Sequence, residues 1–191
     1  MRGERQTPLH IMLLGRIARW PPVRASSSLH GLTHVNAEKQ PTMVDVSGKA
    51  VTKRTATARS IIRLPPAVMA ALRHDAELVS KKGPVLSTAT LAGVMGAKRT
   101  SDLIPFCHPL GLENCKVTLD VRDADSTIHV HCSATVTGRT GVEMEALTGA
   151  SIAALCVYDM CKALSHDIVI TETRLLAKTG GKADFTAAPG T

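Results

Sequence analysis

The chain has 191 residues, of which 44% are hydrophobic, and it carries a formal net charge of +7. This length suits one globular domain with a tail, and no segment reaches the ~18 consecutive apolar residues that mark a membrane-spanning helix. The charge predicts an anionic partner, which could be nucleic acid, a membrane surface or a phosphorylated small molecule. With one Trp, one Tyr and two Phe, the chain lacks the aromatic platforms on which single-stranded nucleic acids stack, so nucleic acid is disfavoured.

Residues 1–31 differ in composition from the rest of the chain. They contain five arginines and a serine run, but only one acidic residue. An Arg-rich, Ser-containing, acid-poor segment is typical of a mitochondrial transit peptide, which would place the protein in the matrix. The alternatives are a disordered basic tail on a cytoplasmic protein, or a joint left from a longer polyprotein. In each case residues 32–185 form the predicted domain and residues 186–191 a polar tail.

The domain is expected to begin with a strand and a helix. Alternating Thr, Val and Ile side chains predict a strand over residues 49–64. Two prolines end this strand, and because Pro suits the first turn of a helix, a helix is predicted over residues 67–79. Ser87 or Thr88 is expected to cap a second helix that runs to residue 97.

The second half of the domain has stronger periodic signals. Two prolines make residues 103–111 irregular but rigid. Residues 115–121 and 126–137 alternate with a period of two, which is typical of an antiparallel hairpin. A long helix is predicted over about 142–164, and a last strand over 167–178.

The order of these elements predicts an α+β fold: a ferredoxin-like four-stranded antiparallel sheet with helices on one face and an inserted helix. The other face of the sheet would then present Val and Thr side chains with nothing to cover them. We therefore expect a homo-oligomer in which a second subunit covers this face.

Metal and disulfide frameworks are disfavoured. The five cysteines are an odd number without any C-x-x-C pair, which argues against structural zinc and against disulfides. They are interpreted as thiols in a reducing compartment. His129 and His131 share one face of a strand, but no third metal ligand is evident, so we interpret them as solvated or interfacial.

Two groups of ionisable residues lie on the long helix. Asp159 and Lys162 are three positions apart and share a face. A surface ion pair would have little consequence, but the apolar residues around this pair favour shifted pKa values suited to proton transfer. Glu143 and Glu145 begin the same helix, where acids are favoured by the helix dipole, and a functional role is the alternative.

His108 lies beside Cys107 in the proline-containing segment. It is either a histidine hydrogen-bonded in a turn or a group that transfers protons or contacts substrate, since sequence neighbours rarely face each other as nucleophile and base. The loops at residues 82–83 and 139–141 pair a cation with glycine, and their backbone amides could hold phosphate. Neither common phosphate-binding motif is present.

Eight short motifs, spread over residues 32–178, resemble one family. They are LTHVN (32–36), MVDVS (43–47), AKRT (97–100), DLIP (102–105), CHPL (107–110), TGVEMEALT (140–148), YDMCKA (158–163) and RLLAK (174–178). Together they resemble the cyclic pyranopterin monophosphate synthase family, also called molybdenum cofactor biosynthesis protein C. The resemblance covers nearly all of residues 32–185.

The resemblance implies a lyase in molybdenum cofactor biosynthesis. Its substrate would be 3′,8-cyclo-7,8-dihydro-GTP, supplied by a radical enzyme in the preceding step, and its products cyclic pyranopterin monophosphate and diphosphate. A homohexamer built as a trimer of dimers is implied, with active sites between subunits. No resident metal or redox cofactor is implied, while Mg²⁺ accompanying the leaving diphosphate stays open.

The resemblance also assigns roles to residues. The implied catalytic residues are Asp159, Lys162, Lys82 and His108. The implied substrate-binding residues are Phe106, Cys107, His108, Glu143, Met144, Glu145, Lys98 and Arg54, of which the last two look like triphosphate contacts. Two other functions use the same scaffold: a non-catalytic nucleotide-sensing module and an RNA-recognition domain, which the scarcity of aromatic residues disfavours.

Overall fold

The computed structural model describes residues 34–36, 38–74 and 77–188. The predicted N-terminal extension, residues 1–31, lies outside the described residues. The expectation of mitochondrial localisation depends on the composition of that extension. Everything below concerns the unit that begins at His34.

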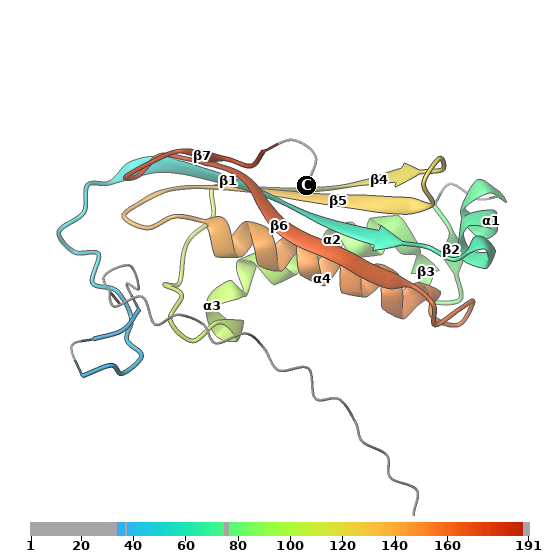
Figure 1. Ribbon diagram of the computed structural model, residues 1–191, viewed down its shortest axis with the longest axis horizontal. Coiled ribbons are helices and arrows are strands. Elements are labelled where there is room, and N and C mark those ends of the chain that lie inside the picture. Colours follow the sequence, from blue (N-terminus) through green and yellow to red (C-terminus); the bar gives the residue numbers. More distant parts are fainter. Residues whose placement is uncertain (1–33, 37, 75–76, 189–191) are drawn as a thin grey trace, which may run out of the picture. The chain divides into compact units, whose positions relative to one another are not determined.

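One antiparallel sheet forms the upper layer of the domain (Figure 1). Its order is β4-β5-β1-β6-β7, and all neighbouring strands are antiparallel. The strands are β1 (Thr52–Arg63), β4 (Asn114–Arg122), β5 (Thr127–Gly138), β6 (Val169–Thr179) and β7 (Phe185–Thr186). A separate short hairpin is formed by β2 (Val79–Ser80) and β3 (Gly83–Pro84). The α+β class and the antiparallel sheet are confirmed.

The predicted count of four strands is wrong, because the sheet has five. After β6, Gly180 and Gly181 adopt φ values of 77° and 105°. This left-handed backbone is easily reached by glycine. It turns the chain back so that β7 pairs with the end of β6, with Thr186 opposite Ala177.

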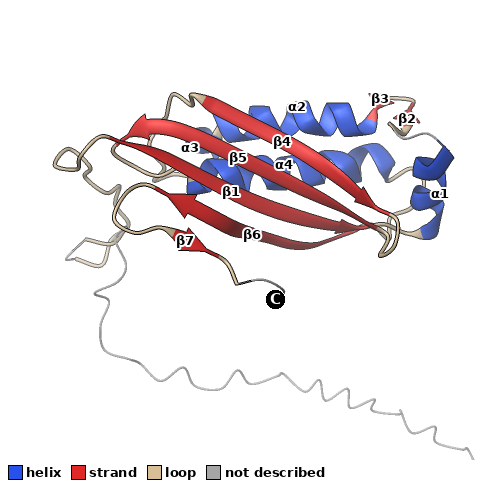
Figure 2. Cartoon of the chain, turned by 90° about the horizontal axis from the view of Figure 1, so that it is seen from above, coloured by secondary structure: helices blue, strands red, loops and turns tan. Residues whose placement is uncertain are grey.

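Four helices lie in the described residues: α1 (Pro66–His74), α2 (Val85–Lys98), α3 (Thr100–Leu103) and α4 (Glu143–Cys161). The two long ones, α2 and α4, run side by side beneath one face of the sheet (Figure 2). Helix α4 packs against β1, β5 and β6, while α2 packs against β4 and α4. A Cβ on Gly93 of α2 would lie 2.9 Å from the carbonyl oxygen of Gly149 in α4, so the close approach of the two helices depends on these glycines.

The ends of two helices differ from the sequence expectation. Helix α1 stops at His74 rather than residue 79, and Leu78 adopts a φ of 48° just before the β2–β3 hairpin. Helix α2 begins at Val85 after Pro84, without a side-chain cap. The predicted cap is therefore wrong, and the Thr88 hydroxyl instead donates to the Pro84 carbonyl within the first turn, at 2.6 Å.

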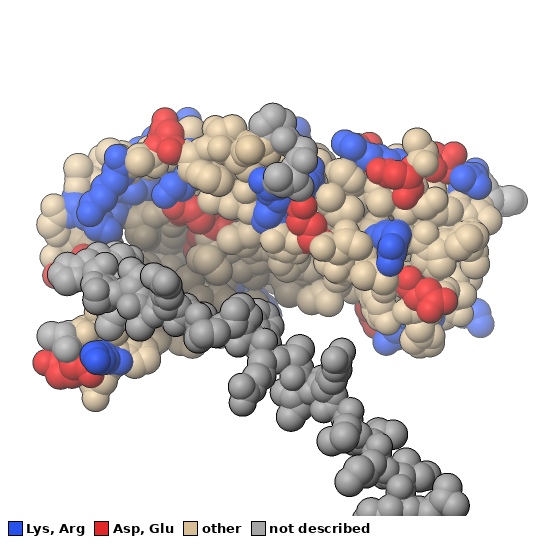
Figure 3. Space-filling view, in the orientation of Figure 1, with Lys and Arg blue, Asp and Glu red and all other residues tan. Residues whose placement is uncertain are grey.

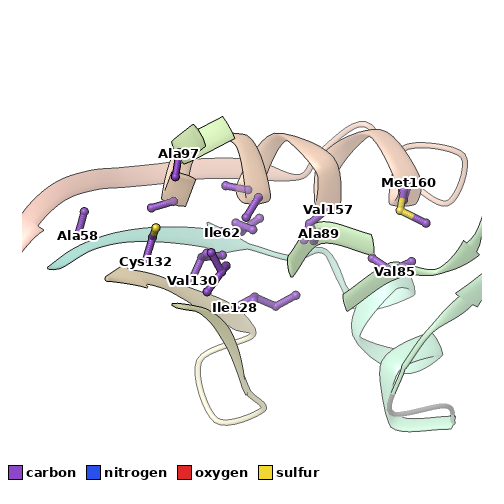
Figure 4. Packing of buried hydrophobic residues seen from close by; sticks show 14 of the residues in the cluster. Ala58, Ile62, Val85, Ala89, Ala97, Ile128, Val130, Cys132, Val157 and Met160 are labelled. Atoms are coloured by element: carbon purple, nitrogen blue, oxygen red, sulfur yellow. The ribbon is translucent and has the colours of Figure 1, made fainter. Parts of the chain in front are cut away.

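The core lies between the sheet and the two long helices (Figure 4). Alternate residues of β5 face it, as the period of two predicts, and Val130 and Cys132 are fully buried. Ile62 of β1 and Val157 of α4 both belong to this layer. By length and composition α4 could cross a membrane, but buried core helices share these properties and half of its apolar window is buried here. We read α4 as the core helix of the domain.

Candidate active site

Lys82, Asp159 and Lys162 form one ionic cluster. The Lys82 ammonium lies 2.6 Å from Oδ2 of Asp159, and the Lys162 ammonium lies 2.8 Å from Oδ1. Asp159 and Lys162 share a face at the C-terminal end of α4 because they are three positions apart. Lys82 comes from the turn of the β2–β3 hairpin, where Gly83 adopts a φ of 107° and the Lys82 amide donates to the Ser80 hydroxyl. The structure thus brings together three of the four predicted catalytic residues.

The electrostatics of this cluster differ from the sequence expectation. All three side chains are about half exposed, so burial does not set their charge. Hydrogen bonds from Lys162 and Lys82 lower the pKa of Asp159 to about 2. The Asp159 carboxylate raises the pKa of Lys162 in return. The apolar residues that suggested a buried pair, such as Ala153 and Val157, are themselves buried in the core, away from the charged groups.

The cluster lies on the rim of a pocket of about 510 Å³. Behind the charged groups the lining is largely apolar, and it is contributed by α1, by the β2–β3 hairpin and by the end of α4. The apolar lining residues include Ala71, Leu78, Val79, Met160 and Leu164. Apolar walls with a few convergent polar groups are the usual character of a small-molecule site.

A second group of polar residues surrounds Glu145 at the other end of α4. Its side chain is only 4% exposed, and this burial raises the pKa of its carboxyl group. The pKa of the half-buried Cys107 thiol is also raised, first by burial and then by the nearby charge of Glu145. Next to this pair, the Lys178 ammonium binds Oε1 of Glu143 at 2.9 Å.

The loop after α3 presents the predicted substrate-binding stretch. The Cys107 amide donates to the Ile104 carbonyl at 3.0 Å, which closes the proline-containing turn. Phe106 is exposed, whereas Cys107 and His108 are half-buried. The predicted irregular conformation is confirmed for residues 104–111, whereas Leu103 is the last residue of α3.

The two predicted triphosphate contacts come from different elements. Arg54 of β1 donates through Nε to the Gly138 carbonyl at 3.0 Å. Lys98 is the exposed last residue of α2. The pKa of Cys115 is lowered chiefly by a hydrogen bond with Cys132, and the charge of Lys98 adds to this effect.

One chain does not bring all the predicted site residues together. At a rise of ~1.5 Å per residue, Glu145 and Asp159 lie roughly 21 Å apart along the axis of α4. The Lys82–Asp159–Lys162 cluster is therefore at one end of the helix, and the Cys107–Glu145 pair is at the other. We call these the lysine end and the glutamate end of α4.

The two strand histidines do not form a metal centre with other groups. The rings of His129 and His131 are 6.4 Å apart between centroids. His129 is buried rather than solvated, and its Nδ1 atom has no hydrogen-bond partner among the described residues. In the described part of the chain, no group of three or more His, Cys, Asp or Glu side chains is placed to hold a metal ion.

Charged acid and base groups beside an apolar pocket are typical of an enzyme that acts on a small molecule by proton transfer. Comparison with protein families matches residues 43–181 to the MoaC family. The chain therefore belongs to the MoaC family, as its motifs predict.

Three relatives illustrate this membership. A Xanthomonas oryzae pv. oryzae protein named "Cyclic pyranopterin monophosphate synthase" is 54% identical over 164 residues, covering 86% of this chain and 98% of the relative. "Molybdenum cofactor biosynthesis protein 1" of Dictyostelium discoideum is 49% identical over 79% of this chain, which spans 26% of that longer protein. "Molybdenum cofactor biosynthesis bifunctional protein" of a Synechocystis species is 47% identical over 82% of this chain and 46% of its own length.

Proposed function

We propose that this protein is a cyclic pyranopterin monophosphate synthase. It converts the cyclised dihydro-GTP into cyclic pyranopterin monophosphate and releases diphosphate, as a step of molybdenum cofactor biosynthesis. Relatives with that name align over nearly their whole length at about half identity, which supports the assignment. The observation that carries it is the Lys82–Asp159–Lys162 cluster on the rim of an apolar pocket.

The charge states of Asp159 and Lys162 indicate which of the two side chains can donate a proton. A ring that is opened and closed again must gain and lose several protons, which positioned side chains can supply. With a pKa of about 2, Asp159 stays ionised at neutral pH and cannot donate a proton. Its carboxylate instead holds the two ammonium groups in place. Lys162, whose pKa is raised, begins the reaction as an acid.

The separation of the two ends of α4 supports an active site shared between subunits. A two-fold axis near the middle of α4 would pair two copies of the helix in antiparallel orientation, and would place the lysine end of one beside the glutamate end of the other. The outer face of the helical layer is apolar enough for such contact. Its exposed side chains include Leu91, Met95, Met144 and Leu155. We extend this dimer to a hexamer, a trimer of dimers, by the family resemblance.

The same proposal includes a ferredoxin-like core, a mitochondrial location and coupling to a radical enzyme. The long strands follow the order β4-β5-β1-β6, which supports a ferredoxin-like core with β7 added at its edge. The Arg-rich residues 1–31 support import into the mitochondrial matrix. Coupling to a radical enzyme follows from the substrate, which such an enzyme must supply.

Turnover of the cyclised GTP tests the proposal. The wild-type chain is supplied with the intermediate, and the pterin product and diphosphate are both measured. Asp159→Asn and Lys162→Ala are each expected to lower the rate by ~10²- to 10⁴-fold. Asp123→Asn is the matched control, because Asp123 is also an exposed, ion-paired carboxylate, and it should retain full activity.

A nucleotide-sensing module would give a different result. It would bind the intermediate without forming product, and that outcome with the wild-type chain would exclude the enzyme. Full activity in both variants would instead show that Asp159 and Lys162 are not the catalytic residues.

A further inference from the structure

Lys82 lies on a very short hairpin. Its strands β2 and β3 have two residues each, with Val79 paired with Pro84 and Ser80 with Gly83. The hairpin lies next to the N-terminus of α2, at the end of the molecule where α4 ends (Figure 2), and Figure 3 shows both cationic and acidic side chains at this end. Two strands of this length are only marginally stable alone, and Pro84 has no amide proton to donate. Other contacts therefore hold Lys82 in place.

A serine hydroxyl closes the turn that carries Lys82. The Ser80 hydroxyl accepts a hydrogen bond from the Lys82 amide at 3.0 Å and donates one to the Gly83 carbonyl at 3.2 Å. Neither Lys81 nor Lys82 has the positive φ of the favoured two-residue turns; it occurs one residue later, at Gly83, where φ is 107°. A serine side chain that bonds to the backbone two residues further on stabilises such a turn. Ser80 thus fixes the backbone from which the Lys82 side chain extends.

Glu77 fastens the base of the hairpin to α2. Its carboxylate accepts from the Ser87 hydroxyl at 3.1 Å and from the Ser87 amide at 3.4 Å, and its carbonyl accepts from the Val85 amide at 3.1 Å. Val85 and Ser87 lie in the first turn of α2, whose N-cap residue Pro84 makes no side-chain capping bond. A carboxylate is favoured at a helix N-terminus, so Glu77 takes over the role of the missing cap. The chain before β2 is thereby anchored to the helix.

The ion pair between Lys82 and Asp159 depends on this support. The two groups are 2.6 Å apart and about half exposed, and a salt bridge between exposed groups contributes little stability. The ion pair therefore cannot hold the hairpin, and the hairpin has to hold the lysine. Because Asp159 is fixed on α4, a displaced hairpin carries the Lys82 ammonium away from it. A shift of ~1 Å in a reacting group can slow a reaction by roughly 10²-fold.

We propose that Ser80 is a positioning residue for Lys82, and that Glu77 fixes the base of the hairpin on which Ser80 acts. This inference rests on the proposed function, because the need for Lys82 in turnover belongs to it. Neither Ser80 nor Glu77 has to touch the substrate. Loss of the Ser80 hydroxyl should therefore slow turnover without weakening substrate binding, since the other contacts of the substrate remain.

Turnover of the cyclised GTP measures the first consequence. Ser80→Ala should lower kcat between about 10- and 100-fold and change KM less than about twofold. Ser80→Thr keeps the hydroxyl on a residue that suits a strand, so it should retain most of the wild-type kcat. Ser165→Ala is the matched control and should turn over as wild type does. The Ser165 hydroxyl also accepts from the amide two residues further on, that of Asp167, at 3.1 Å, but its turn lies between α4 and β6.

Chemical labelling of Lys82 reports its position without any need for turnover. Acetic anhydride acetylates accessible lysines, and mass spectrometry gives the extent of acetylation at Lys82 relative to the exposed Lys116 of β4. Contact with Asp159 shields the Lys82 ammonium, so its labelling should rise severalfold in Ser80→Ala and stay at the wild-type level in Ser80→Thr. If Ser80→Ala is unfolded at the assay temperature, Glu77→Gln, which removes the charged contact with α2, takes its place with the same expected direction.

Two results would overturn the inference. One is wild-type kcat in Ser80→Ala, and the other is a lower kcat with unchanged labelling of Lys82, which would mean that Ser80 acts elsewhere. If the wild-type chain makes no pterin product, yet labelling of Lys82 rises in Ser80→Ala, Ser80 holds Lys82 as inferred and the assigned reaction is wrong. If the wild-type chain makes product and Ser80→Ala matches it, the reaction stands and Lys82 is held in another way.

Discussion

Mixing two inactive variants tests whether the active site is shared between subunits. Lys162→Ala damages only the lysine end of α4, whereas His108→Ala damages only the loop beside the glutamate end. In a two-fold dimer with one variant in each subunit, one of the two sites combines the intact lysine end of one chain with the intact glutamate end of the other. The second site of that dimer carries both defects.

The expected recovery follows from counting sites. Random exchange of equal amounts makes half of the dimers mixed, and each mixed dimer has one intact site of two, so activity should reach about one quarter of wild type for an isologous pair. The roughly 21 Å between Glu145 and Asp159 along α4 is the structural reason for expecting recovery at all.

The assay is turnover of the cyclised GTP after the two proteins have been unfolded and refolded together. Each variant refolded alone sets the background. Lys162→Ala mixed with Asp159→Asn is the control, because both changes lie at the lysine end and no intact site can form. Activity no higher than background in the first mixture would refute a shared site and place the whole reaction within one chain.

Two further predictions concern stability. Burial and the charges of Arg122 and Arg59 lower the pKa of His129, so its neutral form stabilises the fold above the ordinary pKa of 6.5, and that stability is lost as pH falls below it. Chemical denaturation of the wild type should therefore show a fall in stability from pH 7 to pH 5 that His129→Gln reduces; an equal fall in both would contradict the argument. In α4, a Cβ at Gly149 would lie 2.5 Å from Sγ of Cys132 and 3.1 Å from the Gly93 carbonyl oxygen. Gly149→Ala should thus lose about 1 kcal/mol or more, because overpacking outweighs the better helix propensity of Ala. Denaturant titration against Ser151→Ala, a half-buried position on the same helix, checks this, and a gain in stability would refute it.

Regular alternation made much of the sheet predictable. The residues of β5 that the sequence places on the core face, from Ile128 to Val136, are all buried, although Thr127 and His129 on the opposite face are buried as well. β7 was missed because it is only two residues long, and too short a segment carries no period. It forms only because two glycines accept left-handed backbone and bring it beside β6.

The candidate site was only partly predictable, for a different reason. Helical spacing places Asp159 and Lys162 on one face, and the structure has them there. Spacing gives no information about which loop from a distant part of the chain approaches that face. The family resemblance implied a catalytic role for Lys82, but its contact with Asp159 is seen only in the structure. Glu143 and Lys178 each lie in a motif that the sequence shows, but nothing in the sequence predicts that these two side chains contact each other.

The two ends of α4 carry carboxyl groups that are shifted in opposite directions. Lysine contacts lower the pKa of Asp159 to about 2, whereas burial raises the pKa of Glu145. Carboxyl groups whose environments separate their pKa values can divide the roles of acid and base in one reaction. Within one chain they are too far apart to act on the same molecule. The antiparallel pairing of two helices proposed above would bring this ionised carboxylate and this more readily protonated one to a single substrate, so that assembly would complete the acid–base pair.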